Sequence, residues 1–361
     1  MKRVRVMLIF GGRSAEHDVS RVTAVAVAAA LDPDRYEVVP VAITTDGSWL
    51  LASDAAALIE SRPNALPEAF EIAGEHLDTL GAAVAAPASG GLDVDVVFPL
   101  LHGPYGEDGT VQGMLELAGV PYVGSGVVGS AVGMDKVMMK RAFAACGLPM
   151  VRHLELRDGG DRRAFGDRVE REIGLPVFVK PANMGSSVGV TKAHDREELV
   201  RAVDRALDFD EWVLAEEAAD GREIEVAVLG DSPPEVSLPG EIVPGGEFYS
   251  YADKYLDGTA QLLTPAPLDD EQIAEVQGLA VRAFEACRLE AMARVDFFLT
   301  TDRGFLVNEV NTIPGFTPIS MYPKLWEVSG LPYSKLIDRL VELAFERHAR
   351  RAQRAGRQRD A

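Results

Sequence analysis

The stretch ARVDFFLTTDRGFLVNEVNTIPGF, residues 293–316, decides the fold. Two runs rich in Val, Phe and Leu, residues 293–300 and 305–311, flank TDRG, a segment typical of a hairpin turn. A two-residue loop at this turn would pair Thr301 with Gly304. The stretch therefore predicts two adjacent antiparallel strands in the last part of the chain.

In this register, Asp296 lies opposite Glu309, and Arg294 lies opposite Asn311. Side chains alternate faces along a strand, so all four project from one side of the sheet. Two carboxylates that face each other repel, and a cation such as Mg²⁺, which prefers oxygen ligands, removes that repulsion. A solvated polar face is the alternative interpretation, and a slip of one residue in the loop would scatter the set over both faces.

The composition limits the class of protein. A chain of 361 residues predicts two or three domains, and 47% hydrophobic residues with 25% charged residues is typical of a globular α/β enzyme. The net charge of −20 argues against a nucleic-acid partner. The chain contains no apolar run of the ~20 residues needed to cross a membrane, and the short apolar start is a strand and not a signal peptide. Two cysteines are too few for a disulfide framework and fit a reducing cytoplasm.

Strand and helix patterns alternate in the first third of the chain, which predicts a parallel sheet with ligands at the carboxyl ends of its strands. Residues 52–92 have no clear periodicity and are interpreted as variable surface with at most one helix. A helix is expected over 130–140, and a small α+β unit spans about 136–220. The tail, residues 347–361, carries six arginines and is predicted to be the solvated end of a helix, with a polyanion-binding arm as the alternative.

Two polar loops follow strands of the first unit. GGRSAEHDVS (11–20) lacks the G-x-G-x-x-G pattern, and Glu16 would repel a pyrophosphate, so a dinucleotide site is disfavoured. Glu16 has an alternative role in countering the helix dipole. In LHGPYGEDGTVQG (101–113), His102 is placed at a strand end to meet a substrate carboxylate. Asp108 in the same loop can simply cap the following helix.

The segment VKPANMGSSVGVTK (179–192) predicts a phosphate site. Lys180 ends a strand and is followed by glycines and serines, which together supply a cation, exposed N–H groups and hydroxyls. The spacing is not that of a Walker motif, and a plain surface hairpin is the alternative.

Three further segments carry weaker signals. VLAEEAADGREIEVAVLG (213–230) places acidic residues at a strand end, where they could contact adenine and ribose or be merely solvated. YSYADKYLDGTAQ (249–261) has the composition of a lid over a polar ligand, with aromatic packing as the alternative. NTIPGFTPIS (311–320) offers N–H groups and a helix N-terminus to an anion.

Taken together, these motifs resemble the ATP-grasp ligases, and among them the D-alanine–D-alanine ligases, over about residues 4–345. GGRSAEHDVS, LHGPYGEDGT, GMDK, KPANMGSSVG, YADKY and NEVNTIPGFTPIS match that family in order. Only residues 52–92 and the Arg-rich tail depart from it. The resemblance implies an α/β (α+β) three-domain ATP-grasp fold. Its expected parts are an N-terminal Rossmann-like parallel-sheet substrate domain in 1–135, a central small domain in 136–220, and a C-terminal domain with the Mg²⁺ site in 221–361.

The resemblance also implies a role for each motif residue. At ATP it places Lys136, Lys180, Lys254 and Ser187 on the phosphates, Glu216, Glu217 and Ala219 around adenine, and Glu223 on the ribose. At the metal it places Asp296, Glu309 and Asn311 around two Mg²⁺, with Mn²⁺ as a substitute. At the amino acids it places Glu16, Ser186, Tyr255 and His102 around the first D-alanine, Arg294 and Gly315 at the oxyanion, and Ser320 and Met321 on the second carboxylate.

The implied activity is ATP-dependent ligation of two D-alanine molecules to D-alanyl-D-alanine through a D-alanyl phosphate, with release of ADP and phosphate, for peptidoglycan precursors. Relatives that make D-alanyl-D-lactate lack the lid tyrosine, so Tyr255 favours D-alanine as the second substrate. The family further implies a cytoplasmic homodimer joined through the N-terminal domain.

Three other functions compete with this interpretation. Another ATP-grasp ligase could use a different acid or nucleophile, although Glu16, His102 and Tyr255 favour an amino acid. A non-catalytic nucleotide sensor could keep the ATP site, although the presence of all the metal ligands and lysines argues against it. An NAD-dependent dehydrogenase is disfavoured because the glycine fingerprint is missing.

Overall fold

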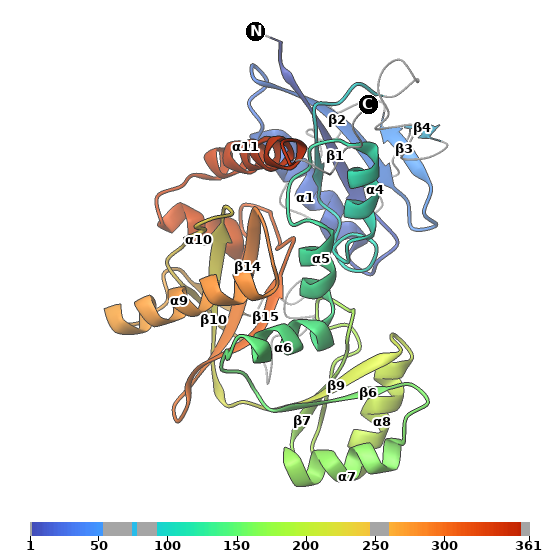
Figure 1. Ribbon diagram of the computed structural model, residues 1–361, viewed down its shortest axis with the longest axis vertical. Helices are drawn as coiled ribbons and strands as arrows, with labels where there is room; N and C mark the ends of the chain where they lie inside the picture. Colours follow the sequence, from blue (N-terminus) through green and yellow to red (C-terminus); the bar gives the residue numbers. More distant parts are fainter. Residues whose placement is uncertain (1, 53–73, 78–91, 246–259, 355–361) are drawn as a thin grey trace.

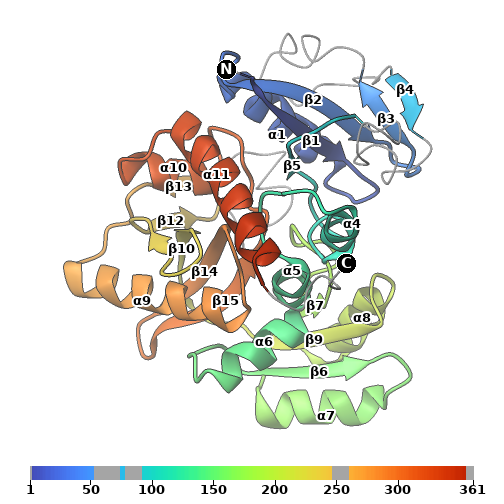
Figure 2. The ribbon, with the colours of Figure 1, turned by 45° about the horizontal axis from the view of Figure 1, so that its top comes forward.

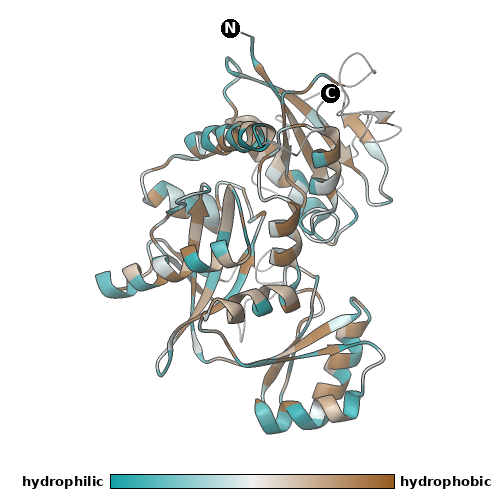
Figure 3. Cartoon of the chain, in the orientation of Figure 1, coloured by the Kyte–Doolittle hydropathy of each residue, from teal (hydrophilic) through white to brown (hydrophobic). Residues whose placement is uncertain are grey.

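The computed structural model describes residues 2–52, 74–77, 92–245 and 260–354. Within these ranges the chain forms three sheets, which lie one after another along the longest axis of the molecule (Figure 1). Helices pack beside each sheet. Three short helices in the described residues, of which the first is α4 (Thr110–Ala118), connect the first sheet to the second. Hydrophobic residues predominate in the strands, whereas the helices carry many of the hydrophilic residues (Figure 3).

The N-terminal sheet has a parallel centre, as the sequence predicts. β1 pairs in parallel with both β2 and β5, so the carboxyl ends of these three strands lie at one edge. Two further strands extend the sheet in antiparallel fashion, which the sequence did not predict. The last of them, β4, belongs to residues 52–92, where at most a helix was expected; most of that segment lies outside the described residues. The sheet order is β4 (Gly74–Leu77), β3 (Trp49–Ala52), β2 (Tyr36–Ile43), β1 (Val4–Gly11) and β5 (Val96–Pro99).

The central sheet is antiparallel and has both of its longer helices on one face (Figure 1). The expected helix over 130–140 is instead two helices. Asp135 has an extended backbone conformation, which ends α5. It is also the N-cap of α6, because its side chain accepts a hydrogen bond of 2.9 Å from Met138 N. The elements are α5 (Val127–Met134), α6 (Lys136–Ala145), β6 (His153–Arg157), α7 (Arg162–Glu172), β7 (Val177–Pro181), β8 (Thr191–Ala193), α8 (Arg196–Leu207) and β9 (Trp212–Glu217).

The C-terminal sheet is also antiparallel and contains the predicted hairpin as β14 and β15. Alternate residues of its central strands are apolar and pack on α9, which begins with a capping box formed by Asp269 and Gln272. The elements are β10 (Gly221–Leu229), β11 (Glu235–Val236), β12 (Gly240–Val243), β13 (Gln261–Leu263), α9 (Asp270–Ala286), β14 (Met292–Thr300), β15 (Gly304–Asn311) and α10 (Met321–Val328).

The last helix, α11 (Tyr333–Ala352), lies between the N-terminal and C-terminal sheets (Figure 2). Its apolar residues Leu336, Leu340 and Val341 belong to one core that also contains Leu8 of β1 and Phe98 of β5. One buried core therefore joins the first and last parts of the chain.

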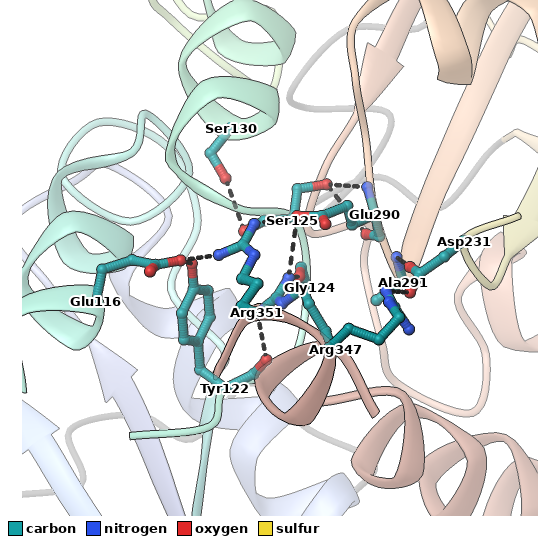
Figure 4. A network of polar contacts seen from close by, with 11 residues as sticks. Glu116, Tyr122, Gly124, Ser125, Ser130, Asp231, Glu290, Ala291, Arg347 and Arg351 are labelled. Atoms are coloured by element: carbon teal, nitrogen blue, oxygen red, sulfur yellow. Dashed lines mark hydrogen bonds and ion pairs between the residues drawn. The ribbon is translucent and has the colours of Figure 1, made fainter. Parts of the chain in front are cut away.

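The start of the Arg-rich tail is not solvated, contrary to expectation. Arg347 is only 3% exposed and donates to the carbonyl oxygens of Tyr122, at 2.6 Å, and Gly124. Its guanidinium also lies 4.2 Å from the centroid of the Tyr122 ring. Arg351 pairs with Glu116 and Glu290, so the two arginines connect three segments of the chain (Figure 4). The end of the tail lies outside the described residues.

Within the ranges that the structure describes, no helix is both long enough and apolar enough to span a lipid bilayer.

Candidate active site

The predicted carboxylate face is present on the C-terminal sheet. Asp296 pairs with Glu309 and Arg294 pairs with Asn311, as the sequence predicts. Arg294 donates to both carboxylate oxygens of Asp296 at 2.8 Å, and Asn311 Nδ2 donates to Asp296 Oδ2 at 2.9 Å. Burial opposes the charge of Arg294, but the neighbouring carboxylates outweigh it and raise its pKa. Hydrogen bonds therefore join Arg294, Asp296 and Asn311, and Glu309 lies opposite Asp296 as a second carboxylate.

The turn that precedes this group differs from the prediction. Thr300, and not Thr301, pairs with Gly304, so the loop has three residues. Gly304 has φ +67, the left-handed conformation that such a loop needs. This slip alone would turn Glu309 away from Asp296, but a β-bulge next to Asp296 places Asn308 and Glu309 opposite that one residue. The bulge restores the predicted pairing at the functional end of the hairpin.

A cavity of about 660 Å³ lies between the central and C-terminal sheets and includes this face. Most of the residues expected at ATP and metal line it: Lys136, Lys180, Ser187, Glu216, Glu217, Ala219, Glu223, Asp296, Glu309 and Asn311. Ser186, expected at the first D-alanine, and Arg294, expected at the oxyanion, line it as well. The predicted lid residues Lys254 and Tyr255 lie outside the described residues, so the structure does not place them.

Three lysines surround buried carboxylates at this cavity. Lys180 Nζ lies 2.7 Å from Glu216 Oε2, and Lys140 Nζ lies 3.0 Å from Glu216 Oε1. Lys136 Nζ donates to the carbonyl oxygen of Met184 at 2.6 Å and lies 4.0 Å from Glu309. Burial would lower the pKa of Lys180, but Glu216 and Glu309 outweigh it and raise that pKa, so Lys180 stays charged. Burial likewise opposes ionisation of Glu216, but the two lysines outweigh it and lower its pKa.

Lys140 was not predicted from the sequence, although a signal for it exists. It lies four residues after Lys136 on α6, so the two side chains share a helix face. Glu225, two residues after Glu223 on β10, was missed in the same way; its carboxylate lies 3.1 Å from Arg294 Nε.

The loop after Lys180 brings the N-terminal unit to the cavity. Ser186 and Ser187 both have positive φ values, +46 and +61, which is unusual away from glycine. Ser186 Oγ donates to the carboxylate of Glu16, which is buried at the start of α1 (His17–Ala30). A Cβ on Gly185 would lie 2.9 Å from Glu16 Oε2, so a larger residue there would displace the Glu16 carboxylate. Two of the predicted site residues from distant parts of the sequence thus meet.

His102 is buried beside this contact. Its Nδ1 lies 3.1 Å from the carbonyl oxygen of Ile313, which fixes the proton on Nδ1. Its Nε2 has no hydrogen-bond partner among the described residues. Burial lowers the pKa of His102, which Glu16 only partly offsets, so the ring is neutral at physiological pH and Nε2 can accept a proton or a hydrogen bond.

Glu107 joins the same loop to the segment after β15. Its carboxylate accepts hydrogen bonds from Gly103 N, at 2.6 Å, and Ile313 N, at 3.1 Å. Asp108 accepts from Thr110 N at 2.9 Å, but the residue at the N-cap of the following helix is Gly109, so Asp108 is not the predicted cap and contacts only the first N–H group of that helix. The loop of 101–109 is therefore held by its own acidic side chains against the strand end that carries Asn311.

Gly315, Ser320 and Met321 lie beyond Ile313 on the way into α10. A Cβ on Gly315 would lie 3.1 Å from Ser320 Oγ, so the two approach closely. Ser320 Oγ lies 2.7 Å from Thr317 Oγ1 and accepts from Thr317 N at 3.2 Å. The Met321 side chain is buried in the shared core, so only its backbone can contact a ligand. These three residues do not line the 660 Å³ cavity.

Glu217 and Glu223, expected at adenine and ribose, both line the cavity. Arg152 and Arg303 both pair with Glu217. Burial opposes its ionisation, but hydrogen bonds from the arginines outweigh this effect and lower its pKa to about 2. Glu223 lies on β10 opposite Phe298 of β14 and lines the cavity wall.

The donor set on β14 and β15 fits a hard cation. Two carboxylates and one amide oxygen can be supplied by Asp296, Glu309 and Asn311, and oxygen donors of this kind are what Mg²⁺ prefers. The part of the chain that the structure describes contains no cluster of three or more His, Cys, Asp or Glu side chains that could hold a metal. Asn311 is therefore needed as the third ligand beside Asp296 and Glu309.

Comparisons with known proteins agree with this geometry. A family model described as D-ala D-ala ligase N-terminus matches residues 5–125, and one described as D-ala D-ala ligase C-terminus matches residues 142–342. A D-alanine–D-alanine ligase of Geobacillus thermodenitrificans is 47% identical over 353 residues, which cover 96% of each chain. One of Thermoanaerobacter sp. is also 47% identical, over 96% of this chain and 98% of the relative.

Solved structures give the same result. The D-alanine–D-alanine ligase from Coxiella burnetii superposes with a TM-score of 0.84 at 35% identity, over 98% of this chain and 97% of that one. A D-Ala:D-Ser ligase from Enterococcus faecalis superposes with a TM-score of 0.82 at 31% identity, over 95% of this chain and 100% of that one.

Proposed function

This chain belongs to the D-alanine–D-alanine ligase family, and from that premise we propose a role for each group around its central cavity. The architecture is the ATP-grasp fold that the sequence predicts. The protein is a ligase that joins two D-alanine molecules at the expense of ATP, through a D-alanyl phosphate, for cell-wall precursor synthesis. Three separate sheets support a division into units at 1–135, 136–220 and 221–361.

The chemistry explains why cations surround the cavity. A carboxylate does not accept an amine, because oxide would have to leave. Its oxygen therefore first attacks the γ-phosphorus of ATP, and ADP leaves. Two anions must approach each other in this step, so we assign Lys136, Lys180 and Lys254, with Ser187, to the phosphates. Adenine then lies against Glu216, Glu217 and Ala219, and the ribose against Glu223.

We assign two Mg²⁺ ions to Asp296, Glu309 and Asn311. Mg²⁺, or Mn²⁺ in its place, supplies positive charge between the triphosphate and the attacking carboxylate when it is bound. Among the protein's own groups, Arg294 holds Asp296 in position through two hydrogen bonds of 2.8 Å, and its charge faces the site of the developing oxyanion. Gly315 has no side chain to obstruct the same position.

On the amino-acid side, Glu16 binds the ammonium group of the first D-alanine, and Ser186 and Tyr255 close that site. The second D-alanine binds through its carboxylate at Ser320 and the backbone of Met321. Its amine must lose a proton before it attacks the acyl carbon and displaces phosphate. The unpaired Nε2 of His102 is suitably placed beside Glu16 to receive a hydrogen bond from the first substrate.

The observation that carries the proposal is the meeting of Asp296, Glu309, Lys136 and Lys180 at one cavity with the Glu16–Ser186 contact at its edge. Purified protein with ATP, Mg²⁺ and D-alanine should release ADP and phosphate, and mass spectrometry should identify D-alanyl-D-alanine. L-Alanine should give no product. D-Serine and D-lactate as second substrates should give less product than D-alanine, since the D-Ala:D-Ser ligase is the more distant relative.

A second experiment separates a ligase from a nucleotide sensor. Glu309→Gln keeps the shape of the side chain but removes one anionic ligand of the cation. We expect turnover to fall by about 100-fold or more, while ADP affinity without metal changes by no more than about threefold. An equal loss of turnover and metal-free affinity would favour simple binding.

We further propose that the enzyme works in the cytoplasm as a homodimer joined through its N-terminal unit. Both cysteines are free, which suits a reducing compartment. Light scattering coupled to gel filtration should give twice the mass of the 38.9 kDa chain.

A further inference from the structure

Lys140 lies behind the wall of the cavity, in contact with the lining residues Glu216 and Asn308, and the reaction as assigned above does not use it. Its side chain is 1% exposed, on the inner face of α6. A buried ammonium is costly unless it is paired and hydrogen-bonded. The contacts that keep it there therefore indicate what it does.

Its first contact is with the wall of the nucleotide site. Lys140 Nζ lies 3.0 Å from Oε1 of Glu216, whose other oxygen pairs with Lys180 at 2.7 Å. Glu216 is thus held between two ammonium groups at the end of β9. Oε1 is itself buried, so its charge depends on the ammonium group of Lys140.

Its second contact is with the bulge of the metal-binding strand. Lys140 Nζ donates to the carbonyl oxygen of Asn308 at 3.3 Å. Asn308 is the extra residue that brings Glu309 opposite Asp296. The bulge disturbs the ladder locally, and a bulged carbonyl needs a partner outside the sheet. Lys140 supplies that partner.

We propose that Lys140 is a positioning residue that couples the two halves of the ATP site, by holding Glu216 on the central sheet and the Asn308 bulge on the C-terminal sheet in one arrangement. The inference rests on the proposed function, because it assigns nucleotide to the first half and cation to the second. Lys140 contacts neither substrate; it acts through Glu216 and through the position of Glu309.

The test compares Lys140→Met with Arg141→Met. Methionine matches the length of the lysine chain but lacks its charge. Arg141 is the next residue on the same helix, half-exposed and paired with Glu155 on the outside, so its substitution removes the same charge without touching the cavity. Calorimetric titration with ADP, with and without Mg²⁺, measures both halves of the site without requiring turnover.

We expect Lys140→Met to weaken ADP binding by about 10- to 100-fold, as the loss of one charge-assisted hydrogen bond implies. The Mg²⁺ concentration for half-saturation should rise several-fold as well. The KM for ATP should rise with it, while the KM for D-alanine stays within about twofold, a split that a general loss of stability would not produce. Arg141→Met should match the wild type in every one of these measurements.

A folded Lys140→Met protein with wild-type affinity for ADP and Mg²⁺ would overturn the proposal. If that variant does not fold, Lys140→Gln keeps a hydrogen-bond donor without the charge and should show the same loss; wild-type binding in folded Lys140→Gln would equally overturn it. Failure of the proposed function is recognised separately, because it would appear as absence of D-alanyl-D-alanine in the wild-type assay.

Discussion

At the scale of single residues, the site is built from ionisable groups whose charge depends on burial. Glu107 shows this most directly, because it is buried and lies close to Glu16. Burial and the charge of Glu16 together raise the pKa of Glu107 to about 8, although two backbone N–H groups favour its ionised form. Ionisation of this group in the folded protein therefore occurs near physiological pH.

The raised pKa of Glu107 predicts a pH dependence of stability. Between the unfolded value near 4.5 and about 8, the folded state keeps a proton that the unfolded state has lost. Stability must therefore fall as the pH rises through this window. Glu107→Gln loses one hydrogen-bond acceptor, so it should be less stable than the wild type at pH 6. Its stability should not fall between pH 6 and pH 9 through this group, because glutamine does not ionise. Thermal melting of both proteins from pH 6 to pH 9 tests the difference in slope, and parallel curves would show that Glu107 does not titrate in this range.

At the scale of secondary-structure elements, the hairpin of β14 and β15 combines two irregularities that cancel. The three-residue loop shifts the pairing by one, and the bulge at Asn308 shifts it back. The predicted pairing therefore holds at the end of the hairpin that carries Asp296 and Glu309, and these two side chains project from the same face of the sheet. Gly304 permits the loop because its φ of +67 is accessible without strain only to glycine.

Two glycines give a matched test of this argument. Gly304→Ala forces a side chain into the left-handed region and should destabilise the protein by about 1 kcal/mol. Gly278 lies in the middle of α9, and an added methyl group there would meet nothing within 4 Å, so Gly278→Ala should stabilise by about 0.5–1 kcal/mol. Urea unfolding measures both. Turnover should stay normal in each variant, since the bulge and not the loop sets the pairing of Glu309; a large loss in Gly304→Ala alone would contradict this.

The same hairpin shows how far prediction from the sequence can go. Alternation predicts which residues share a face, and it identified Asp296, Glu309, Arg294 and Asn311 correctly. Alternation cannot reveal that two register shifts cancel. A two-residue loop without a bulge and a three-residue loop with a bulge give the same pairing from Asp296 onward, so the sequence pattern does not distinguish them. Helix breaks are equally hidden: Asp135 is a good cap, but nothing nearby in the sequence requires α5 to stop there.

Local sequence patterns also do not show which distant residues a side chain will contact in the folded protein. In the sequence, Lys140 resembles any other polar residue on a helix; its role depends on β9 and β15, which only the fold places beside it. Arg347 likewise resembles the rest of a basic tail, and only the fold places the segment 122–125 over it. Both are cationic side chains that tertiary structure buries, against the usual preference for the surface.

At the scale of the whole molecule, α11 connects units that are far apart in sequence. Its apolar face completes the core between the N-terminal and C-terminal sheets, and its arginines contact the segment that leads into α5. The same segment is tied to the C-terminal unit by Ser125, whose Oγ accepts from Glu290 N at 3.1 Å. Since α6 follows directly, these contacts fix the base from which Lys136 reaches the cavity and Lys140 reaches Glu216 in its wall.

Arg347→Met should therefore weaken the whole protein and not only one helix. The change leaves the carbonyl oxygens of Tyr122 and Gly124 buried without their donor and removes the contact with the Tyr122 ring, at a cost of about 2–4 kcal/mol. For a protein of this size the melting temperature should fall by about 3–5 °C. Arg339→Met is the control, because its pair with Glu346 lies on the surface of the same helix and should contribute less than about 1 kcal/mol. Equal melting temperatures for the two variants would mean that the buried arginine does not hold the units together, and that the apolar face of α11 suffices.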